Sequence, residues 1–155
     1  MPKAMTPFAI ALYQPDIAAN VGAIARLGAC FGLDVHIIEP AGFPWSHAAL
    51  RRAGMDYLDH VALIRHDCWA DFQRRMEGRR IVLASTAAAV ELPDFTFRPH
   101  DVTLFGRESA GVPDDVGAQA AARVRIPMRR GMRSLNLAMS AAIISAEAMR
   151  QLGLF

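Results

Sequence analysis

The fold is decided by residues 8–38, which read FAIALYQPDIAANVGAIARLGACFGLDVHII. Phe8 to Tyr13 is a short, continuous apolar run, which is typical of a strand buried on both faces. The next stretch carries apolar residues at helical spacing between Asn20, a residue suited to begin a helix, and Gly32, a residue suited to end one. Asp34 to Ile38 reads as a second strand. A strand, helix and strand in this order predict parallel strands.

The same alternation continues to the carboxyl end of the sequence. We expect further helices over residues 46–53, 67–76 and 114–122 and from Ser134, as N-cap, to about residue 152, and further strands over residues 61–64, 80–84, 102–105 and 123–126. The sum is a single α/β domain over residues 1–155, with a mostly parallel sheet flanked by helices. Its ligand site should lie in the loops beyond the carboxyl ends of the strands.

The composition limits the class of protein. The chain has 155 residues, of which 53% are hydrophobic, and this suits one domain with one core. No apolar run approaches the roughly 20 residues that cross a bilayer, and the first residues lack the layout of a signal peptide. We therefore expect a cytoplasmic protein that does not enter membranes. Cys30 and Cys68 have no metal-ligand spacing, so we expect no metal site.

The positive charge is almost entirely arginine. The net charge is only +2, but 16 of the 17 basic residues are arginine and one, Lys3, is lysine. The guanidinium group matches two phosphate oxygens at once, which favours a nucleic-acid partner. A codon bias toward arginine and alanine explains the same composition equally well. The positions of the arginines in the chain must therefore distinguish a nucleic-acid partner from codon bias.

Three segments contain candidate catalytic or ligand-binding residues, and the first runs from Asn20 to Arg26. Gly22 and Arg26 are four residues apart, so they share one face of the predicted helix. The arginine side chain leans over the glycine, where the missing Cβ leaves room for another molecule. The alternative, favoured by this segment alone, is a tolerated glycine beside a solvated arginine.

The second and third segments follow later strands. In residues 105–113, FGRESAGVP, two glycines permit close approach of the backbone, and Glu108 between them can accept hydrogen bonds. Residues 126–137, IPMRRGMRSLNL, place Arg129, Arg130 and Arg133 before a helix, and helix N-termini bind anions. The alternative for residues 105–113 is an ordinary turn, and the alternative for residues 126–137 is a solvated, charged surface loop. The sequence has neither the G-x-G-x-x-G motif of dinucleotide-binding folds nor a Walker motif.

Taken together, the motifs resemble the signature of the SPOUT family of RNA methyltransferases, which are trefoil-knotted and use S-adenosylmethionine. The matching segments are N-x-G-x-x-x-R at residues 20–26, F-G-x-E-x-x-G-x-P at 105–113, and I-P-M with S-L-N-L within 126–137. Residues 38–45 and 50–57 look most like the subgroup that methylates the ribose of the wobble nucleotide, cytidine or uridine 34, of tRNA. The resemblance implies a parallel α/β sheet with a C-terminal trefoil knot, a homodimer and a reaction without metal.

The resemblance also implies roles for individual residues. The cofactor-binding candidates are Ala84, Gly106, Glu108, Ile126, Ser134 and Asn136, and the catalytic candidates are Arg26, Asn20 and Ser134. In that family the arginine is proposed to activate the hydroxyl group. Because arginine is effectively always protonated in proteins, we favour a role in orienting phosphate and stabilising developing oxyanion charge.

The implied partner is the anticodon stem-loop of tRNA, rather than DNA or a membrane. Aromatic residues Phe43, Trp45 and Tyr57 interleave with Arg51 and Arg52, which suits base stacking and phosphate binding. Trp45 could equally be a core or dimer-interface residue. With these two arginines, the loop arginines Arg129, Arg130 and Arg133 complete the RNA-binding candidates.

Alternative functions stay open at this point: methylation of another tRNA position or of rRNA, or a catalytically silent RNA-binding dimer. The chain departs from the family pattern at Ala23, Ala138, Met139 and Ala146. These departures bear on the identity of the RNA target.

Overall fold

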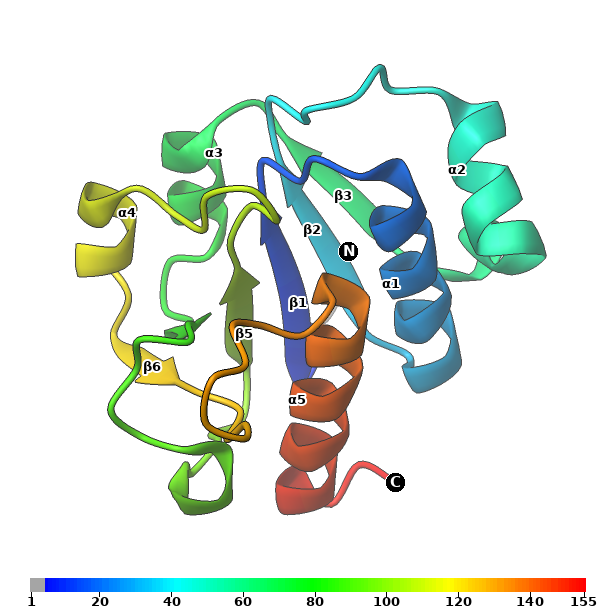
Figure 1. Cartoon of the computed structure of the whole chain (residues 1–155). Coiled ribbons are helices and arrows are strands. Elements are labelled where there is room, and N and C mark those ends of the chain that lie inside the picture. The colour runs from blue at the N-terminus through cyan, green and yellow to red at the C-terminus, as the bar shows by residue number, and fades with distance from the viewer. Residues whose placement is uncertain (1–4) are drawn as a thin grey trace.

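The computed structural model describes residues 5–155, which form a six-stranded sheet with helices on both faces (Figure 1). The order of the strands across the sheet is β3-β2-β1-β5-β4-β6, and every neighbouring pair is parallel. The strands are β1 (Phe8–Tyr13), β2 (Asp34–Ile38), β3 (Leu63–His66), β4 (Ile81–Ala84), β5 (Asp101–Phe105) and β6 (Ala122–Val124). The predicted parallel α/β sheet is confirmed.

The helices divide between the two faces of the sheet. They are α1 (Ala18–Phe31), α2 (His47–Gly54), the 3-10 helix η1 (Met55–His60), α3 (Trp69–Arg75), the 3-10 helix η2 (Leu92–Asp94), α4 (Asp114–Ala118) and α5 (Leu137–Leu152). Helices α1, α2 and α5 lie on one side of the sheet, and α3 and α4 lie on the other (Figure 1). Helix α5 packs against both α1 and β1.

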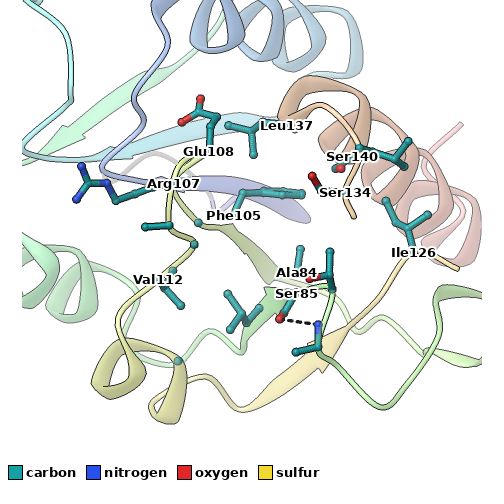
Figure 2. Close-up of a pocket in the computed structure, with 18 of the residues that line it drawn as sticks. Ala84, Ser85, Phe105, Arg107, Glu108, Val112, Ile126, Ser134, Leu137 and Ser140 are labelled. Atoms are coloured by element: carbon teal, nitrogen blue, oxygen red, sulfur yellow. Dashed lines mark hydrogen bonds between the residues drawn. The ribbon is translucent and has the colours of Figure 1, made fainter. Parts of the chain in front are cut away.

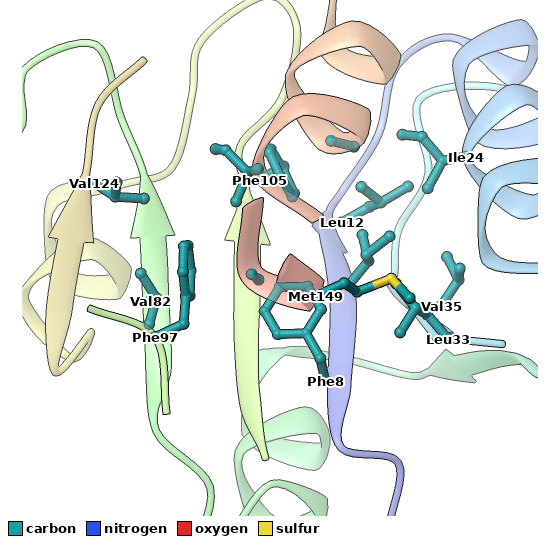
Figure 3. Packing of buried hydrophobic residues seen from close by; sticks show 14 of the residues in the cluster. Phe8, Leu12, Ile24, Leu33, Val35, Val82, Phe97, Phe105, Val124 and Met149 are labelled. Atoms are coloured by element: carbon teal, nitrogen blue, oxygen red, sulfur yellow. The ribbon is translucent and has the colours of Figure 1, made fainter. Parts of the chain in front are cut away.

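The central strand β1 is buried on both of its faces, as its continuous apolar sequence predicts. Because side chains alternate along a strand, Phe8, Ile10 and Leu12 pack into one apolar layer and Ala9 and Ala11 into the other. Figure 3 shows the first layer, in which side chains of β1, α1 and α5 meet. The sheet is thus the middle of a three-layer fold.

The pairing register explains why loops that are distant in the sequence meet. At the carboxyl end of β1, Leu12 lies beside Phe105 of β5, and Ala84 of β4 lies on the other side of Phe105. The segments that follow these parallel strands must therefore leave the sheet at one edge, which is where ligands bind in folds of this class.

Both predicted N-caps are wrong. Helix α1 begins at Ala18, so Asn20 lies in its first turn, and the backbone N–H of Asn20 donates to the carbonyl of Ile17. Helix α5 begins at Leu137 with Asn136 as its cap, instead of Ser134. Gly32 and Gly153 end their helices in left-handed conformations, as expected.

The prediction that Gly22 leaves room for another molecule is also wrong. Gly22 is buried, whereas Arg26 on the same helix is exposed. Because Gly22 is buried in the folded chain, its missing Cβ does not leave an open space on the surface of α1.

Smaller differences concern the ends of elements. The third strand covers residues 63–66 instead of 61–64, the helix after Pro113 ends at Ala118, and the last strand covers residues 122–124. No helix within residues 5–155 has the length and apolar character to cross a membrane. The trefoil knot stays a prediction.

Candidate functional site

A cavity of about 1000 Å³ opens at the carboxyl ends of β4, β5 and β6, beside the N-terminus of α5 (Figure 2). Its wall is built from four segments that are far apart in the sequence. They fall within residues 83–87, 105–114, 123–128 and 133–144, with Gly117 added from α4 and Ile17 and Asn20 from the N-terminal end of α1. A cavity therefore lies where the ligand site is expected, beyond the carboxyl ends of the strands.

The loop after β5 depends on two glycines. Arg107 and Gly111 exchange backbone hydrogen bonds of 2.9 and 2.8 Å, which close the loop, and Gly111 has a φ of 65°. A Cβ on Gly106 would come within 2.5 Å of the carbonyl carbon of Gly111. Only glycine at position 106 lets the two backbone segments approach this closely.

A chain of side-chain hydrogen bonds connects the three motif segments. The carboxylate of Glu108 accepts a bond of 3.3 Å from Nδ2 of Asn20. Oδ1 of Asn20 in turn accepts a bond of 3.2 Å from Nδ2 of Asn136. Glu108, Asn20 and Asn136 thus tie together the loop after β5, the first turn of α1 and the start of α5.

Asn136 completes this chain by capping α5. Its Oδ1 accepts hydrogen bonds from the backbone N–H groups of Ala138, at 2.9 Å, and Met139, at 3.3 Å. These are two of the N–H groups that a helix N-terminus leaves without partners inside the helix. One asparagine therefore begins α5 and orients it on α1.

Asp16 lies outside the cavity lining but holds the loop after β5, a role that the sequence analysis missed. Its Oδ2 accepts hydrogen bonds from Oγ of Ser109, at 2.6 Å, and from the backbone N–H of Ser109, at 3.1 Å. Arg107 donates to Oδ1 at 3.3 Å, and the backbone N–H of Asp16 donates to Glu108 at 2.8 Å. The bonds from Ser109, followed by the Arg107 guanidinium, hold the pKa of Asp16 below its usual value. The signal in the sequence that could have identified Asp16 is a carboxylate shortly after the end of the first strand, which ends at Tyr13.

The wall of the cavity mixes apolar and hydroxyl side chains. Leu83, Ile126, Leu137 and Ile144 supply apolar surface, and Ser85, Ser134 and Ser140 supply hydroxyl groups. Figure 2 shows these two kinds of side chain around the opening, with Ser85 below and Ser134 and Ser140 opposite. Ser85 and Ser140 were missed because nothing local in their sequence distinguishes them, and Leu137 was not named although it ends the S-L-N-L segment.

This lining fits S-adenosylmethionine. Apolar side chains suit the adenine ring, while the polar groups of the loop backbone and the hydroxyl groups can fix its orientation. The volume lies at the upper end of the range for small-molecule sites. Among residues 5–155 no group of three or more potential metal ligands is placed to hold a metal ion.

The structure brings together every residue predicted to bind the cofactor. Ala84, Gly106, Glu108, Ile126, Ser134 and Asn136 all line the cavity, together with Asn20 and Arg133. The other predicted residues, Arg26, Arg51, Arg52, Trp45, Arg129 and Arg130, lie outside its lining.

Arg26 is exposed on α1 and lies over an aromatic ring. Its guanidinium carbon lies 4.7 Å from the centroid of the Tyr57 ring, which belongs to η1. Arg26 is six residues beyond Asn20, or about 9 Å along the helix axis at 1.5 Å per residue. The arginine therefore lies away from the cavity wall, although its helix contributes to that wall.

The other predicted RNA-binding residues fall into two groups. Trp45 and Arg51 already have partners in the chain: the guanidinium of Arg65 lies 4.1 Å from the Trp45 ring, and Arg51 pairs with Asp59 at 3.2 Å. Within residues 5–155, no hydrogen bond or ion pair is found for the exposed side chains of Arg52, Arg129, Arg130 and Arg133.

Comparisons with known proteins agree with this geometry. The model of the SpoU rRNA methylase family matches residues 7–146. The tRNA (cytidine(34)-2′-O)-methyltransferase of Ancylobacter novellus is 56% identical over 149 residues, covering 95% of this chain and 94% of that protein. A solved structure concerned with the 2-OH methylation of C/U34 on tRNA has a TM-score of 0.89 and 41% identity, and covers 94% of this chain and 96% of that chain.

A second solved structure bears on the cofactor. The AdoMet-bound rRNA methyltransferase of Sinorhizobium meliloti has a TM-score of 0.84 and 27% identity, and covers 95% of this chain and 59% of that longer one. The family model covers most of the sequence, and the Ancylobacter novellus protein is similar over nearly its full length. With the motif residues gathered at one cavity, the conclusion is that this chain belongs to the SpoU rRNA methylase family.

Proposed function

We propose that this protein uses S-adenosylmethionine to methylate the ribose 2′-hydroxyl of nucleotide 34, a cytidine or uridine, in tRNA. The observation that carries the proposal is the meeting of Asn20, Glu108 and Asn136, one from each motif segment, at a single cavity. The similarity to tRNA (cytidine(34)-2′-O)-methyltransferases selects the substrate. The proposal treats residues 1–155 as one methyltransferase domain acting in the cytoplasm.

The cavity residues would hold the cofactor, which supplies a methyl group activated by its sulfonium charge. Ala84, Gly106 and Ile126 would contact it mainly through the backbone, and Ser134 would add a hydroxyl group at the cavity wall. Asn20 would act as a positioning residue through Glu108 and Asn136, because its side chain is engaged with both. Gathering the reactants in a closed site is the main contribution an enzyme makes when the donor is already activated.

Arg26 would act on the RNA side of the reaction. Its exposed guanidinium can bind the phosphate next to the target ribose and stabilise the negative charge that develops on the 2′-oxygen. This role needs a permanently charged group, which arginine provides. The position of Arg26 outside the cavity lining agrees with an approach of the ribose from the solvent side.

The arginines that have no partner among residues 5–155 would bind the RNA backbone. Arg129, Arg130 and Arg133 lie in the loop that leads to α5, and Arg52 lies on α2. Arg51 and Trp45 would contribute less, since each already has a partner in the chain. The anticodon stem-loop is the segment of tRNA that presents nucleotide 34 in a single-stranded loop, where a base can be splayed out.

A homodimer is part of the proposal, and α5 provides the surface for it. Met139 and Ile143 lie on this helix and are 63% and 42% exposed, whereas Ile144 and Ala148 are buried against the sheet. Adjacent exposed apolar side chains on a helix mark a contact surface. Light scattering should give twice the chain mass for the native protein and the single chain mass for Ile143→Asp; a native monomer would refute the dimer.

The function can be tested with purified protein, labelled S-adenosylmethionine and a tRNA that carries cytidine at position 34. Mass spectrometry of nuclease digests should find one added methyl group on the ribose of nucleotide 34. The matched substrate with a 2′-deoxyribose at position 34 should accept none, and Arg26→Ala should abolish transfer while retaining cofactor affinity. Methylation of a base, of another tRNA position or of rRNA fragments, or cofactor-independent RNA binding, would contradict the proposal.

A further inference from the structure

We propose that Tyr57 is a positioning residue for the methyl transfer, because its ring holds the guanidinium of Arg26 toward the bound RNA. The inference rests on the proposed function, since it concerns the arginine that acts there. Tyr57 belongs to η1, whereas Arg26 belongs to α1, so the contact exists only in the folded chain.

The distance between the two groups is that of a cation–π contact. The guanidinium carbon of Arg26 lies 4.7 Å from the centroid of the Tyr57 ring. A cation within about 6 Å of a ring centroid is attracted by the negative face of the ring. Arg26 is exposed, and attraction to the ring favours the rotamers that place its guanidinium over Tyr57.

The ring is itself held in place by the surrounding structure. Tyr57 is half-buried, and the neighbouring Leu58 packs against the main apolar core. Helix η1 packs against α1, and the ion pair between Asp59 and Arg51 ties η1 to α2. Tyr57 therefore presents a fixed platform under a long, flexible side chain.

This kind of contact is compatible with substrate binding. A cation–π contact uses the positive charge of the guanidinium and consumes none of its N–H donors. Binding of a phosphate or a ribose oxygen needs those donors in a defined orientation. The contact with Tyr57 therefore does not itself compete with the RNA for these donors.

The test compares Tyr57→Phe, which keeps the ring, with Tyr57→Leu, which removes it. We expect Tyr57→Leu to lower kcat about twofold to fivefold, the size of one cation–π contact at an exposed site, and Tyr57→Phe to keep the native kcat. Cofactor affinity, measured by calorimetry, should be unchanged in both, since Tyr57 lies outside the cavity lining. Native kcat in Tyr57→Leu, or equal losses in both variants, would overturn the proposal.

A variant elsewhere in the chain serves as the control for the destabilisation caused by losing an aromatic ring. Phe95→Leu removes a comparable arginine–aromatic contact, in which Arg80 lies 5.4 Å from the ring centroid near the opposite end of the sheet. This variant should keep the native kcat below its melting temperature. A loss equal to that of Tyr57→Leu would indicate general destabilisation and overturn the proposal.

A second measurement does not depend on activity. In the absence of RNA and cofactor, the Nε–Hε NMR signal of Arg26, assigned with Arg26→Lys, should show a ring-current shift that persists in Tyr57→Phe and disappears in Tyr57→Leu. Absence of that difference would overturn the stacking itself. No methylation of nucleotide 34 by the native protein would instead refute the proposed function, and with it the catalytic part of this inference, while leaving the NMR result intact.

Discussion

Nδ2 of Asn136 donates a 3.2 Å hydrogen bond to Oδ1 of Asn20, joining the start of α5 to the first turn of α1 across 116 positions of sequence. Each asparagine has a second partner, which is Glu108 for Asn20 and the N-terminal amides of α5 for Asn136. A change at either end of this chain should therefore affect both the stability of α5 and the shape of the cavity.

Asn136→Ala should lower the free energy of unfolding by about 1–2 kcal/mol, because it removes an N-cap and one interhelical hydrogen bond. Asn136→Ser retains an N-cap oxygen but is too short to reach Asn20. The serine variant should therefore recover most of the stability and still bind S-adenosylmethionine more weakly than the native protein. Urea denaturation and calorimetry measure the two quantities. Native affinity in the serine variant would contradict a role for the link to Asn20.

Gly106→Ala should reduce cofactor affinity at least about tenfold, since the new Cβ would lie within 2.5 Å of the Gly111 backbone and force the loop to move. Gly117→Ala is the control for stability, because a Cβ there meets nothing nearer than 3.4 Å. The control should unfold at the same urea concentration as the native protein or at a higher one. Unchanged cofactor affinity in Gly106→Ala would show that the loop is not part of the binding site.

Replacing both Arg129 and Arg130 by alanine should weaken tRNA binding and reduce its dependence on salt. Each lost phosphate contact changes the slope of log K against log salt by about 0.7–0.9, so the double variant should be less steep by about 1.5. The double alanine variant of Arg74 and Arg75 on α3 removes the same charge from the other side of the sheet. That control should keep the native slope, measured by filter binding, and equal slopes in all three proteins would contradict the assignment.

His36 should make the protein less stable in acid. Its Nδ1 lies 2.9 Å from Nε2 of His66, and burial, then the charges of His66 and Arg79, lower the pKa of His36 to about 4. Unfolded histidine takes up its proton near pH 6.5, so between pH 6.5 and about 4 the unfolded chain binds more protons than the native one.

The free energy of unfolding should consequently fall as the pH falls through this window, by roughly 3 kcal/mol from His36. Urea denaturation between pH 7 and 4 measures the change. In His36→Gln the fall should be smaller by about this amount, whatever the stability of the variant at pH 7. The same pH dependence in both proteins would contradict the assignment to His36.

Most helices and strands, and most of the residues expected at the cavity, could be predicted from the sequence. Alternation of apolar runs with helical spacing predicts the parallel sheet, because periodicity is a local property of the chain. The motif residues Ala84, Gly106 and Ile126 follow or end strands, and parallel strands deliver such residues to one edge. Their presence in one lining was therefore predictable without coordinates.

Which side chains meet depends on contacts between segments that are far apart in the sequence. The bond from Asn20 to Glu108 spans 88 positions, and its existence depends on the pairing of β1 with β5. Gly22 is buried in the folded chain, and the guanidinium of Arg26 lies over the ring of Tyr57, which belongs to another element. Such contacts arise from the order of strands and the packing of helices, which helical or strand periodicity along the chain does not encode.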